Sequence, residues 1–354
     1  MKIKDFIDYE QPNEYIVESD RYNSKYSTPV LTAGQSFILG YTNESKGVYE
    51  KGPCIIFDDF TTSVHYVDFP FKVKSSAMKI LTTKSNADIK YCYYLLLSLS
   101  KMPPNHKRQW ISTTSEKSYV LPSMDKQISI VKQLDLISDT IANYTNQIEN
   151  LDNLVKARFI EMFGDPVADT RNWGQTLLKE HLESIKYGTS TPPIFTDDGY
   201  AFIRATNIKN GKIITNDMKY IPQEEADRLE KCKLSGGEII IVRSGVNAGD
   251  TCIVTDEYIG QYAGYDMILV LSSDLHPVFF NTLINTEYMD KVVKPLTRRA
   301  AQPHLNSEQT QRLPIIEVPF ELQEQFADFV KQVDKSRFDI KKSIIELERE
   351  VVYD

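Results

Sequence analysis

Hydrophobic residues recur at alternating gaps of four and three along two stretches of the chain, residues 122–163 and 318–354. A mean period of 3.5 residues kept over several turns is typical of a coiled-coil seam rather than of an ordinary amphipathic helix. The seam residues of the first stretch are Ile130, Leu134, Ile137, Ile141, Tyr144, Ile148, Leu151 and Val155. Those of the second are Phe326, Val330, Val333, Ile340, Ile344, Leu347 and Val351, with Arg337 as a polar member. The pattern predicts two long helices.

Neither predicted helix can hide its apolar stripe alone, so we expect the two to pair with each other. The pairing is antiparallel if the two halves of the chain are related by a two-fold axis. Arg337 would then either fix the register of the pair or meet a carboxylate. The alternative is that the two helices lie separately on the surface of one core.

Proline and glycine mark the ends of these helices. Pro122 and Pro319 lie where each helix would start, a place where proline costs little because the first N–H groups have no partner within the helix. Ser123 is a candidate N-cap of the first helix. Gly164, followed by an Asp-Pro pair, is a clear stop signal for the same helix.

A weak internal repeat runs through the chain. Residues 121–128 are echoed by residues 318–326, and the prolines of these two segments are 197 positions apart. Upstream, the strand-like run at 52–58 matches 237–243, and residues 28–34 resemble 201–206. Each half therefore has the order extended, extended, helix, and this order favours an internal duplication.

These patterns predict an α+β fold. We expect two mixed α/β globules separated by two long helices that form an antiparallel coiled coil, as a pseudo-two-fold repeat. The predicted boundaries are 1–121 for the first globule, 122–163 for the first helix, 164–317 for the second globule and 318–354 for the second helix. Turn signals such as Asn210-Gly211 separate strand-rich segments between the helices.

Composition narrows the class of protein. The 354 residues carry a net charge of −8 at pH 7, which argues against non-specific coating of nucleic acid but leaves room for a local basic patch. The four cysteines are far apart, so we expect neither a disulfide framework nor a zinc site. No apolar run reaches membrane-spanning length, and the first residues lack the apolar core of a signal peptide. We therefore expect a cytoplasmic protein with no membrane partner.

The usual motifs of catalysis are missing from the sequence. It contains neither a G-x-x-x-x-G-K-[ST] phosphate loop nor a G-x-G-x-x-G turn, and its five histidines show no metal-ligand spacing. No Asn/Asp-Pro-Pro-Tyr/Phe run of an amino-methyltransferase occurs either. The acid-x-Lys tripeptides at 44–46 and 88–90 resemble part of a metal nuclease, but no second acidic motif accompanies them. We therefore expect no catalytic residues and no metal bound by this chain.

Two basic, amide-rich loops are the strongest candidates for a function. They lie at 105–110 and 298–306, each shortly before a proline-started helix. Arginine suits guanine edges or phosphates, whereas asparagine and glutamine suit adenine edges. The residues that we predict to contact DNA, in these loops and beside the strands, are Asn105, His106, Lys107, Arg108, Lys186, Tyr187, Ser190, Arg204, Arg243, Ser244, Arg298, Arg299, Gln302, His304 and Asn306.

A plainer explanation exists for each of these residues. A basic loop is usually just solvated surface. Arg204 and Arg243 flank apolar strands, so each could equally pair with a carboxylate. Both explanations stay open at the level of sequence.

With these residues in view, the chain resembles the DNA-specificity subunit of type I restriction-modification systems. The likeness rests on the two proline-started helices, the end of the first helix at 159–166, the runs at 28–34 and 237–245, and a turn from glutamine to asparagine at 302–306. It covers essentially the whole chain, and the order of the segments is repeated twice.

The resemblance implies two target-recognition domains, each reading one half of a split DNA site, on a coiled coil that acts as a ruler. It implies double-stranded DNA, two methyltransferase (modification) subunits and restriction subunits as partners in a host-defence system. Adenine-N6 methylation by S-adenosylmethionine and cleavage driven by ATP and Mg would belong to those subunits, so this chain would bind no cofactor. The first globule is short for the family, so we expect an N-terminal conserved segment to be reduced or supplied by the C-terminal helix.

Two other classes of protein remain as alternatives. A two-domain protein–protein scaffold would join partners through its helices and lack DNA specificity. An enzyme with a weak nuclease site of its own would nick DNA in the presence of a metal. Selection from random duplexes separates the first alternative from a DNA reader, and a nicking assay separates the second.

Overall fold

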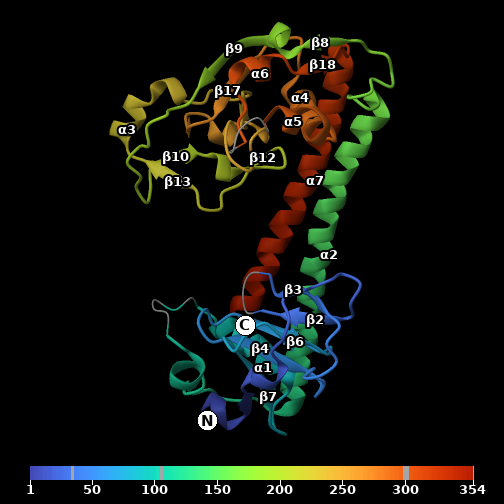
Figure 1. Ribbon diagram of the computed structural model, residues 1–354. Coiled ribbons are helices and arrows are strands. Elements are labelled where there is room, and N and C mark those ends of the chain that lie inside the picture. Colours follow the sequence, from blue (N-terminus) through green and yellow to red (C-terminus); the bar gives the residue numbers. More distant parts are fainter. Residues whose placement is uncertain (33–35, 102, 104–106, 298–302, 354) are drawn as a thin grey trace. The chain divides into compact units, whose positions relative to one another are not determined.

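The structure is a computed structural model that describes residues 1–354 except 33–35, 102, 104–106, 298–302 and 354, with side chains as far as Arg349. The chain divides into two compact units (Figure 1). The first comprises Met1–Tyr144 and Ser343–Asp354, and the second comprises Thr145–Lys342. Each unit therefore contains part of both long helices, and each is described by itself.

The two long helices are α2 (Met124–Phe163) and α7 (Phe320–Tyr353), which begin two residues after their predicted starts. Gly164 ends α2 in the left-handed conformation, with φ +77°, and its N–H donates to the carbonyl of Ile160 at 2.8 Å. Glycine adopts this conformation without steric cost, so the predicted stop is confirmed.

The first unit is built on a four-stranded antiparallel sheet in the order β1-β7-β4-β5. Its strands are β1 (Ile7–Glu10), β4 (Cys54–Asp58), β5 (Val64–Val67) and β7 (Met78–Thr83). A smaller sheet has the order β3-β2-β6, with strands β2 (Thr28–Leu31), β3 (Ile38–Thr42) and β6 (Lys72–Val73). Helix α1 (Ile89–Leu99) follows β7 and packs Cys92 and Leu96 against Ile55 and Leu81 of the larger sheet.

The second unit has a four-stranded antiparallel sheet in the order β15-β14-β17-β9 and a smaller sheet in the order β13-β10-β16. The larger sheet holds β9 (Leu182–Tyr187), β14 (Ile239–Ile241), β15 (Thr251–Ile253) and β17 (Met267–Leu271), and the smaller holds β10 (Tyr200–Ile203), β13 (Lys219–Ile221) and β16 (Tyr262–Ala263). Two further strand pairs are β11 (Ile208–Lys209) with β12 (Lys212–Ile213), and β8 (Gln175–Leu177) with β18 (Pro314–Ile316). The shorter helices are α3 (Gln223–Arg228), α4 (Pro277–Ile284), α5 (Lys294–Thr297) and α6 (Ser307–Gln311).

The two units repeat one topology. The order β1-β7-β4-β5 corresponds strand for strand to β9-β17-β14-β15, and β3-β2-β6 corresponds to β13-β10-β16, including its parallel pair. The helix that follows the fourth large-sheet strand in the chain is α1 in one unit and α4 in the other. The predicted duplication is therefore confirmed, and the matches of β4 with β14 and of β2 with β10 are those that the sequence indicated.

Near the start of each long helix, a buried glutamine side chain is hydrogen-bonded to the loop that precedes a shorter helix. That shorter helix is α1 in the first unit and α4 in the second. The side chain of Gln127 donates to the carbonyls of Pro122 (2.8 Å) and Asn86 (3.1 Å) and accepts from the N–H of Asp88 (2.8 Å). The side chain of Gln323 donates to the carbonyls of Val318 (2.8 Å) and Asp274 (3.2 Å) and accepts from the N–H of His276 (2.8 Å). Asp88 and His276 are the N-cap residues of α1 and α4, so the same device occurs in both units.

This pair of glutamines corrects the register of the predicted repeat. Gln127 and Gln323 are 196 positions apart, and so are Pro122 and Val318, whose carbonyls accept from these two side chains. The predicted match of Pro122 with Pro319 is therefore wrong by one residue. Pro319 corresponds to Ser123, whose carbonyl accepts from the N–H of Gln127 (2.9 Å) as that of Pro319 accepts from Gln323 (3.3 Å).

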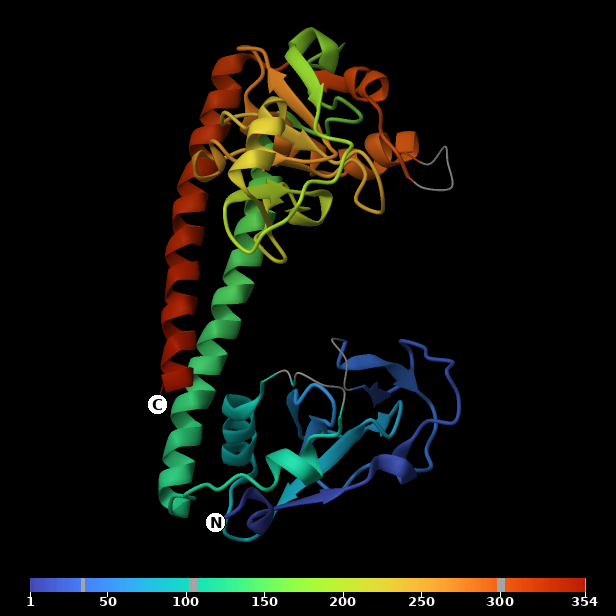
Figure 2. The ribbon, with the colours of Figure 1, turned by 90° about the vertical axis from the view of Figure 1, so that its left-hand side faces the viewer.

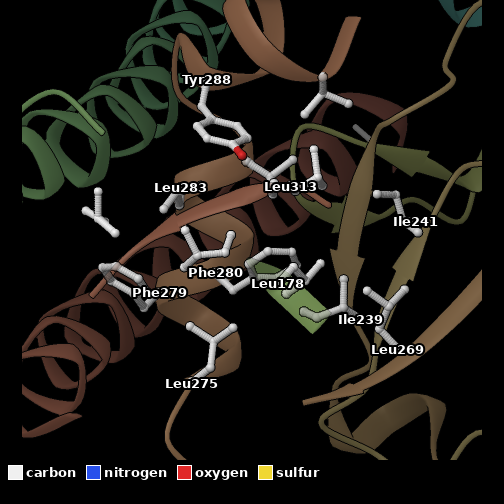
Figure 3. Close-up of a cluster of buried hydrophobic side chains, with 14 of the residues drawn as sticks. Leu178, Ile239, Ile241, Leu269, Leu275, Phe279, Phe280, Leu283, Tyr288 and Leu313 are labelled. Carbon is white, nitrogen blue, oxygen red and sulfur yellow. The ribbon is translucent and has the colours of Figure 1, made fainter. Parts of the chain in front are cut away.

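The main core of the second unit lies between its larger sheet and α4. Figure 3 shows Phe280 of α4 on the side of the sheet residues Ile239, Ile241 and Leu269, whereas Phe279 lies on the far side of that helix, and all five side chains are fully buried. Burial of a side chain of this size is worth about 2 kcal/mol relative to exposure. This core therefore fixes the sheet against α4.

Both long helices contribute to the same core. The rings of Phe159 and Phe163 of α2 lie 5.5 and 5.6 Å from the ring of Phe326 of α7, centroid to centroid. Asp152, earlier on α2, meets Arg337, later on α7, at 2.6 Å. Within the second unit the two helices thus run antiparallel (Figure 2), and the expectation that Arg337 meets a carboxylate is confirmed.

Candidate nucleic-acid interface

A polar cluster in the second unit forms where the central strand β14 ends. The guanidinium of Arg243 lies over the ring of Tyr187, the last residue of β9, with 4.9 Å between its central carbon and the ring centroid. Such a cation–π contact holds a guanidinium flat against an aromatic ring. The hydroxyl oxygen of Tyr187 in turn accepts from the N–H of Ser307 at 2.9 Å.

The loop before α6 is fastened to the residues that follow β14. The N–H of Leu305 donates to the carbonyl of Arg243 (2.8 Å), and the N–H of Gly245 donates to the carbonyl of Pro303 (3.1 Å). The Ser244 hydroxyl and Nδ1 of His304 are 2.8 Å apart. Two segments about 60 residues apart in sequence are thereby held side by side, with Ser244 exposed and His304 half-buried.

Asp266 lies beneath this cluster, just before β17. Its side chain is 3% exposed, and one carboxylate oxygen accepts from the N–H of Arg243 at 2.9 Å. Burial raises the pKa of Asp266 to about 6, although the hydrogen bond and the charge of Arg243 act in the opposite direction. Neither the other carboxylate oxygen nor Nε of Arg243 has a hydrogen-bond partner among the residues that the structure describes.

The first unit carries a different polar cluster at the equivalent place, where β4 ends. Asp59 and Lys79 are both fully buried and form an ion pair, 3.1 Å between Nζ and the carboxylate. The Asp59 carboxylate also accepts from the N–H groups of Gln109 (3.1 Å) and Trp110 (2.9 Å). Lys79 further donates to the side-chain oxygen of Gln11 at 3.0 Å.

The two clusters correspond at the residue whose carbonyl holds the following loop, Asp59 in one unit and Arg243 in the other. The carbonyl of Asp59 accepts from the N–H of Gln109 (2.8 Å), just as the carbonyl of Arg243 accepts from that of Leu305. Gln109 and Leu305 are 196 positions apart, the same offset as the two glutamines. The residue after the central strand is thus acidic in one unit and basic in the other, on one scaffold.

The predicted DNA-contact residues of the first loop lie at the edge of its cluster. Lys107 and Arg108 are exposed, and Nε of Arg108 is 4.0 Å from the Asp59 carboxylate. The predicted residues that lie outside the described part of the chain are Asn105, His106, Arg298, Arg299 and Gln302.

Other predicted contacts are placed elsewhere. Arg204 donates to the Asp217 carboxylate (3.0 Å) and lies over the ring of Phe195 (6.0 Å), so it has the acidic partner that the alternative explanation required. Lys186 precedes Tyr187 on β9 and therefore points to the other face of the sheet, where it lines a hollow of about 430 Å³.

Two further residues complete the predicted set. Ser190 is exposed, three residues past the end of β9. The side-chain oxygen of Asn306 accepts from the N–H of Gln309 at 2.8 Å, and the Gln309 side chain accepts from the N–H of Asn306 at 3.0 Å. This reciprocal pair caps α6, so Asn306 has a structural use whether or not its free amide nitrogen faces DNA.

Sequence reasoning missed Asp59, Lys79 and Gln11. Their pairing joins residues far apart in the chain, so no local pattern reveals it. The repeat gave only an approximate signal, because the sequence match of 52–58 with 237–243 places Asp58, one residue before Asp59, opposite the predicted contact residue Arg243.

The predicted seam residues are all wholly or partly buried: Ile130, Leu134, Ile137, Ile141, Tyr144, Ile148, Leu151, Val155, Val333, Ile340, Ile344 and Leu347. Apolar residues off the seam behave differently, and Leu136 of α2 and Phe338 of α7 are each 68% exposed. A coiled coil over the full helix length, and its use by partner subunits, stay predictions.

The structure also bears on cysteines, metals and membranes. Its four cysteines are buried free thiols. Among the described residues there is no group of three or more His, Cys, Asp or Glu side chains that could hold a metal ion. Within the same part of the chain, no helix is both long and apolar enough to cross a bilayer.

Comparison with known proteins identifies the family to which this fold is similar. Residues 174–349 match the family described as "Type I restriction modification DNA specificity domain". Residues 174–349 of the chain belong to this family of type I restriction-modification DNA-specificity domains.

Individual relatives give the same result. The chain is 44% identical over 160 residues to the type I restriction enzyme EcoR124I/EcoR124II specificity subunit of Escherichia coli, an alignment that covers 43% of this chain and 40% of that protein. The match therefore spans less than half of this relative's length. The MjaVIII specificity subunit of Methanocaldococcus jannaschii is 22% identical over 364 aligned residues, covering 94% of this chain and 85% of that protein.

A solved structure shares the fold across nearly the whole chain. The S subunit of a type I restriction-modification system from M. genitalium superposes with a TM-score of 0.57 at 14% identity, covering 99% of this chain and 93% of that one. At 14% identity this similarity shows that the fold is shared and nothing about function.

Proposed function

We propose that this chain reads a split DNA target for a type I restriction-modification complex, with each unit contacting one half of the target. The observation that carries the proposal is the pair of corresponding polar clusters, built on one topology from different side chains. A shared scaffold places both clusters in the same way, whereas different side chains allow two different base sequences to be read. Membership of residues 174–349 in the DNA-specificity family supports this assignment.

In this proposal the recognition domains are residues 1–121 and 164–317, and the spacer helices are residues 122–163 and 318–354. The first domain would present Lys107 and Arg108, and the second would present Ser244 and His304 beside the Arg243–Tyr187 pair. Exposed Lys and Arg side chains can set the register through phosphate contacts and can also read guanine edges, and the serine and histidine side chains can donate or accept at base edges.

We further propose that α2 and α7 form an antiparallel coiled coil that sets the distance between the two half-sites. The contacts of Phe326 with Phe159 and Phe163, and of Arg337 with Asp152, support this pairing in the second unit. Exposed apolar residues off the seam, such as Leu136 and Phe338, suit docking of two modification subunits and of restriction subunits.

The chemistry would belong to those partner subunits. Adenine-N6 methylation with S-adenosylmethionine and ATP-dependent cleavage need catalytic and nucleotide-binding motifs, and we find none in this sequence. In this proposal the chain itself is not an enzyme, binds no cofactor and acts in the cytoplasm.

Selection from a pool of random duplexes tests the proposed function. The purified chain, alone and together with its modification subunit, should enrich a motif made of two conserved blocks separated by a fixed spacer. Binding should weaken steeply as salt is raised, because phosphate contacts release counterions. No enriched motif at any salt concentration would favour the protein–protein scaffold, and metal-dependent nicking by the chain alone would favour the nuclease.

A further inference from the structure

A charged junction in the second unit joins three elements that are distant in sequence. Asp152 of α2 accepts from Arg337 of α7 (2.6 Å) and from Lys212 of β12 (2.8 Å), and both donors reach the same carboxylate oxygen. Arg337 also pairs with Asp334 on its own helix. The junction therefore ties the helix pair to the β11–β12 hairpin of the recognition domain.

Arg337 is the polar member of an otherwise apolar seam. Because it is buried, the position of α7 relative to α2 depends on its ion pair with Asp152. Its side chain is 7% exposed, although it carries a permanent positive charge. A shift of α7 along α2 by one turn would take the guanidinium away from Asp152 and leave it Asp334 of its own helix, and a buried charge that loses one of its partners is costly. Asp152 thus selects one register of the two helices.

The hairpin that carries Lys212 is fixed at its turn by a second set of contacts. Asn210 and Gly211 both have positive φ (51° and 79°), the geometry of a tight two-residue hairpin turn. The Gly211 carbonyl accepts from the side chain of Asn281 of α4 at 3.0 Å. An added Cβ at Gly211 would lie 2.9 Å from that amide nitrogen, so the turn approaches α4 as closely as glycine allows.

Between the hairpin and the two helices lies a hollow of about 860 Å³, lined by Lys212, Asp152 and Arg337 among others. The hairpin therefore does not rest on the helices through a continuous apolar contact at this place. Burial and the nearby charges of Arg337 and Lys341 lower the pKa of Lys212, against the favourable effect of Asp152. The contact across the hollow is the Lys212–Asp152 ion pair, and the positive charges of Arg337 and Lys341 lie near it.

We infer that the Asp152–Arg337–Lys212 junction is a positioning device that couples the register of the helix pair to the pose of the second recognition domain. This inference rests on the proposed function and names residues that set the permitted spacer between half-sites. None of the three side chains needs to touch DNA for this role. The base preferences within each half-site should be independent of the junction.

Three variants and a control separate the parts of the junction. Lys212→Met releases the hairpin but keeps the Arg337–Asp152 pair, whereas Asp152→Asn weakens both links. Lys212→Arg keeps the charge and should behave like the parent. Glu161→Gln removes an exposed Arg158–Glu161 pair (2.8 Å) from the same helix and serves as the matched control.

Each protein is measured in two ways. Hydrogen exchange reports the protection of the 208–213 amides without any DNA. Binding to duplexes with the selected half-sites, and with spacers shortened or lengthened by one base pair, reports spacer discrimination. We expect faster hairpin exchange and a loss of discrimination of about fivefold for Lys212→Met, the factor that corresponds to about 1 kcal/mol.

The possible outcomes separate cleanly. Faster exchange with lower spacer discrimination, and unchanged half-site preference, supports the inference. Parent-like exchange or parent-like discrimination in folded Lys212→Met overturns it. If Asp152→Asn fails to fold, Lys212→Met still decides, because Lys212 is partly exposed and its loss leaves Arg337 paired. A parent chain that selects no split site refutes the proposed function instead, and the exchange rates then decide alone whether the junction holds the hairpin.

Discussion

Asp59 and Arg243 occupy the same place in two copies of one fold, yet they carry opposite charges. The fully buried Asp59–Lys79 pair fixes the N–H groups of Gln109 and Trp110, which follow the exposed Lys107 and Arg108. Arg243 fixes its loop through a main-chain carbonyl, so its side chain is available to stack on Tyr187. Divergence at this single position therefore changes both the chemistry of the cluster and the way its loop is held.

Removing one member of the buried pair in the first unit should be costly. Lys79→Met leaves the Asp59 carboxylate buried without its cation, and we expect the free energy of unfolding to fall by about 3 kcal/mol. Adding Asp59→Asn should recover part of this loss, because the uncompensated charge is gone. Urea denaturation measures both effects, with Lys84→Met, whose ion pair with Asp8 is exposed, as the control. A change under about 1 kcal/mol for Lys79→Met would contradict the structural role of the pair.

Asp266 gives the second unit a predictable dependence on pH. Since burial raises its pKa from 3.8 to about 6, the folded chain binds this proton more tightly than the unfolded chain does. The contribution of Asp266 to stability is therefore lost as pH rises between these two values, by about 3 kcal/mol. Asp266→Asn should escape this loss, so its stability relative to the parent should increase over that range.

Thermal or urea unfolding at several pH values measures this difference. Asp256→Asn, which removes an exposed carboxylate of the same unit, is the control. A stability difference between Asp266→Asn and the parent that stays constant from about pH 4 to about pH 7 would show that Asp266 is not perturbed as described.

At the scale of elements, sequence periodicity predicted the two long helices well. The period predicted that both helices exist, the prolines placed their starts within two residues of Met124 and Phe320, and the Gly164 stop was correct. Periodicity works here because each seam extends over many turns. The register of the repeat was missed by one residue, because Pro122 and Pro319 look alike in sequence whereas the hydrogen bonds of Gln127 and Gln323 decide the correspondence.

The buried glutamines should be essential to the joint between each long helix and its domain. Gln323→Met keeps the size of the side chain but leaves the carbonyls of Val318 and Asp274 and the N–H of His276 without this partner. Unpaired buried groups cost about 1–3 kcal/mol each, so we expect a loss of at least about 2 kcal/mol and faster exchange at the start of α4. Gln325→Met, on an exposed neighbouring position, should be close to neutral. Equal stability of the two variants would contradict this role.

The helices offer a test of the proposed ruler. Seven residues inserted both after Tyr144 and after Lys342 preserve the 3.5-residue seam and lengthen each helix by about 10 Å. If the helices set the distance between half-sites, the selected spacer should grow by about three base pairs, at about 3.4 Å each. Random-duplex selection with the lengthened chain measures the spacer. An unchanged spacer with intact half-sites would contradict the ruler.

At the scale of the whole molecule, much of the organisation was predictable and most of the site was not. The pairing of segments 52–58 and 237–243 was visible because both are apolar runs that follow a glycine. The strand order was not visible, because hydrogen-bonded neighbours such as β1 and β7 are far apart in sequence. Of the predicted contacts, Arg243, Ser244, His304 and Tyr187 come together through long-range hydrogen bonding and stacking, whereas Lys186 and Arg204 have other surroundings.

Membership of residues 174–349 in the DNA-specificity family and the repeated topology agree on one account of the molecule. In this account the two repeated units would each contact one half of a split DNA target, with different side chains at the corresponding positions. The account requires that the two units can be disabled separately.

The most direct test is random-duplex selection with one cluster altered at a time. Lys107→Ala with Arg108→Ala changes the first unit, and Ser244→Ala with His304→Ala changes the second. We predict that each double variant loses sequence preference in one block of the split motif and keeps the other block, and that the two variants lose different blocks. If both variants lost the same block, or both kept the full motif, the assignment of one half-site to each unit would be wrong.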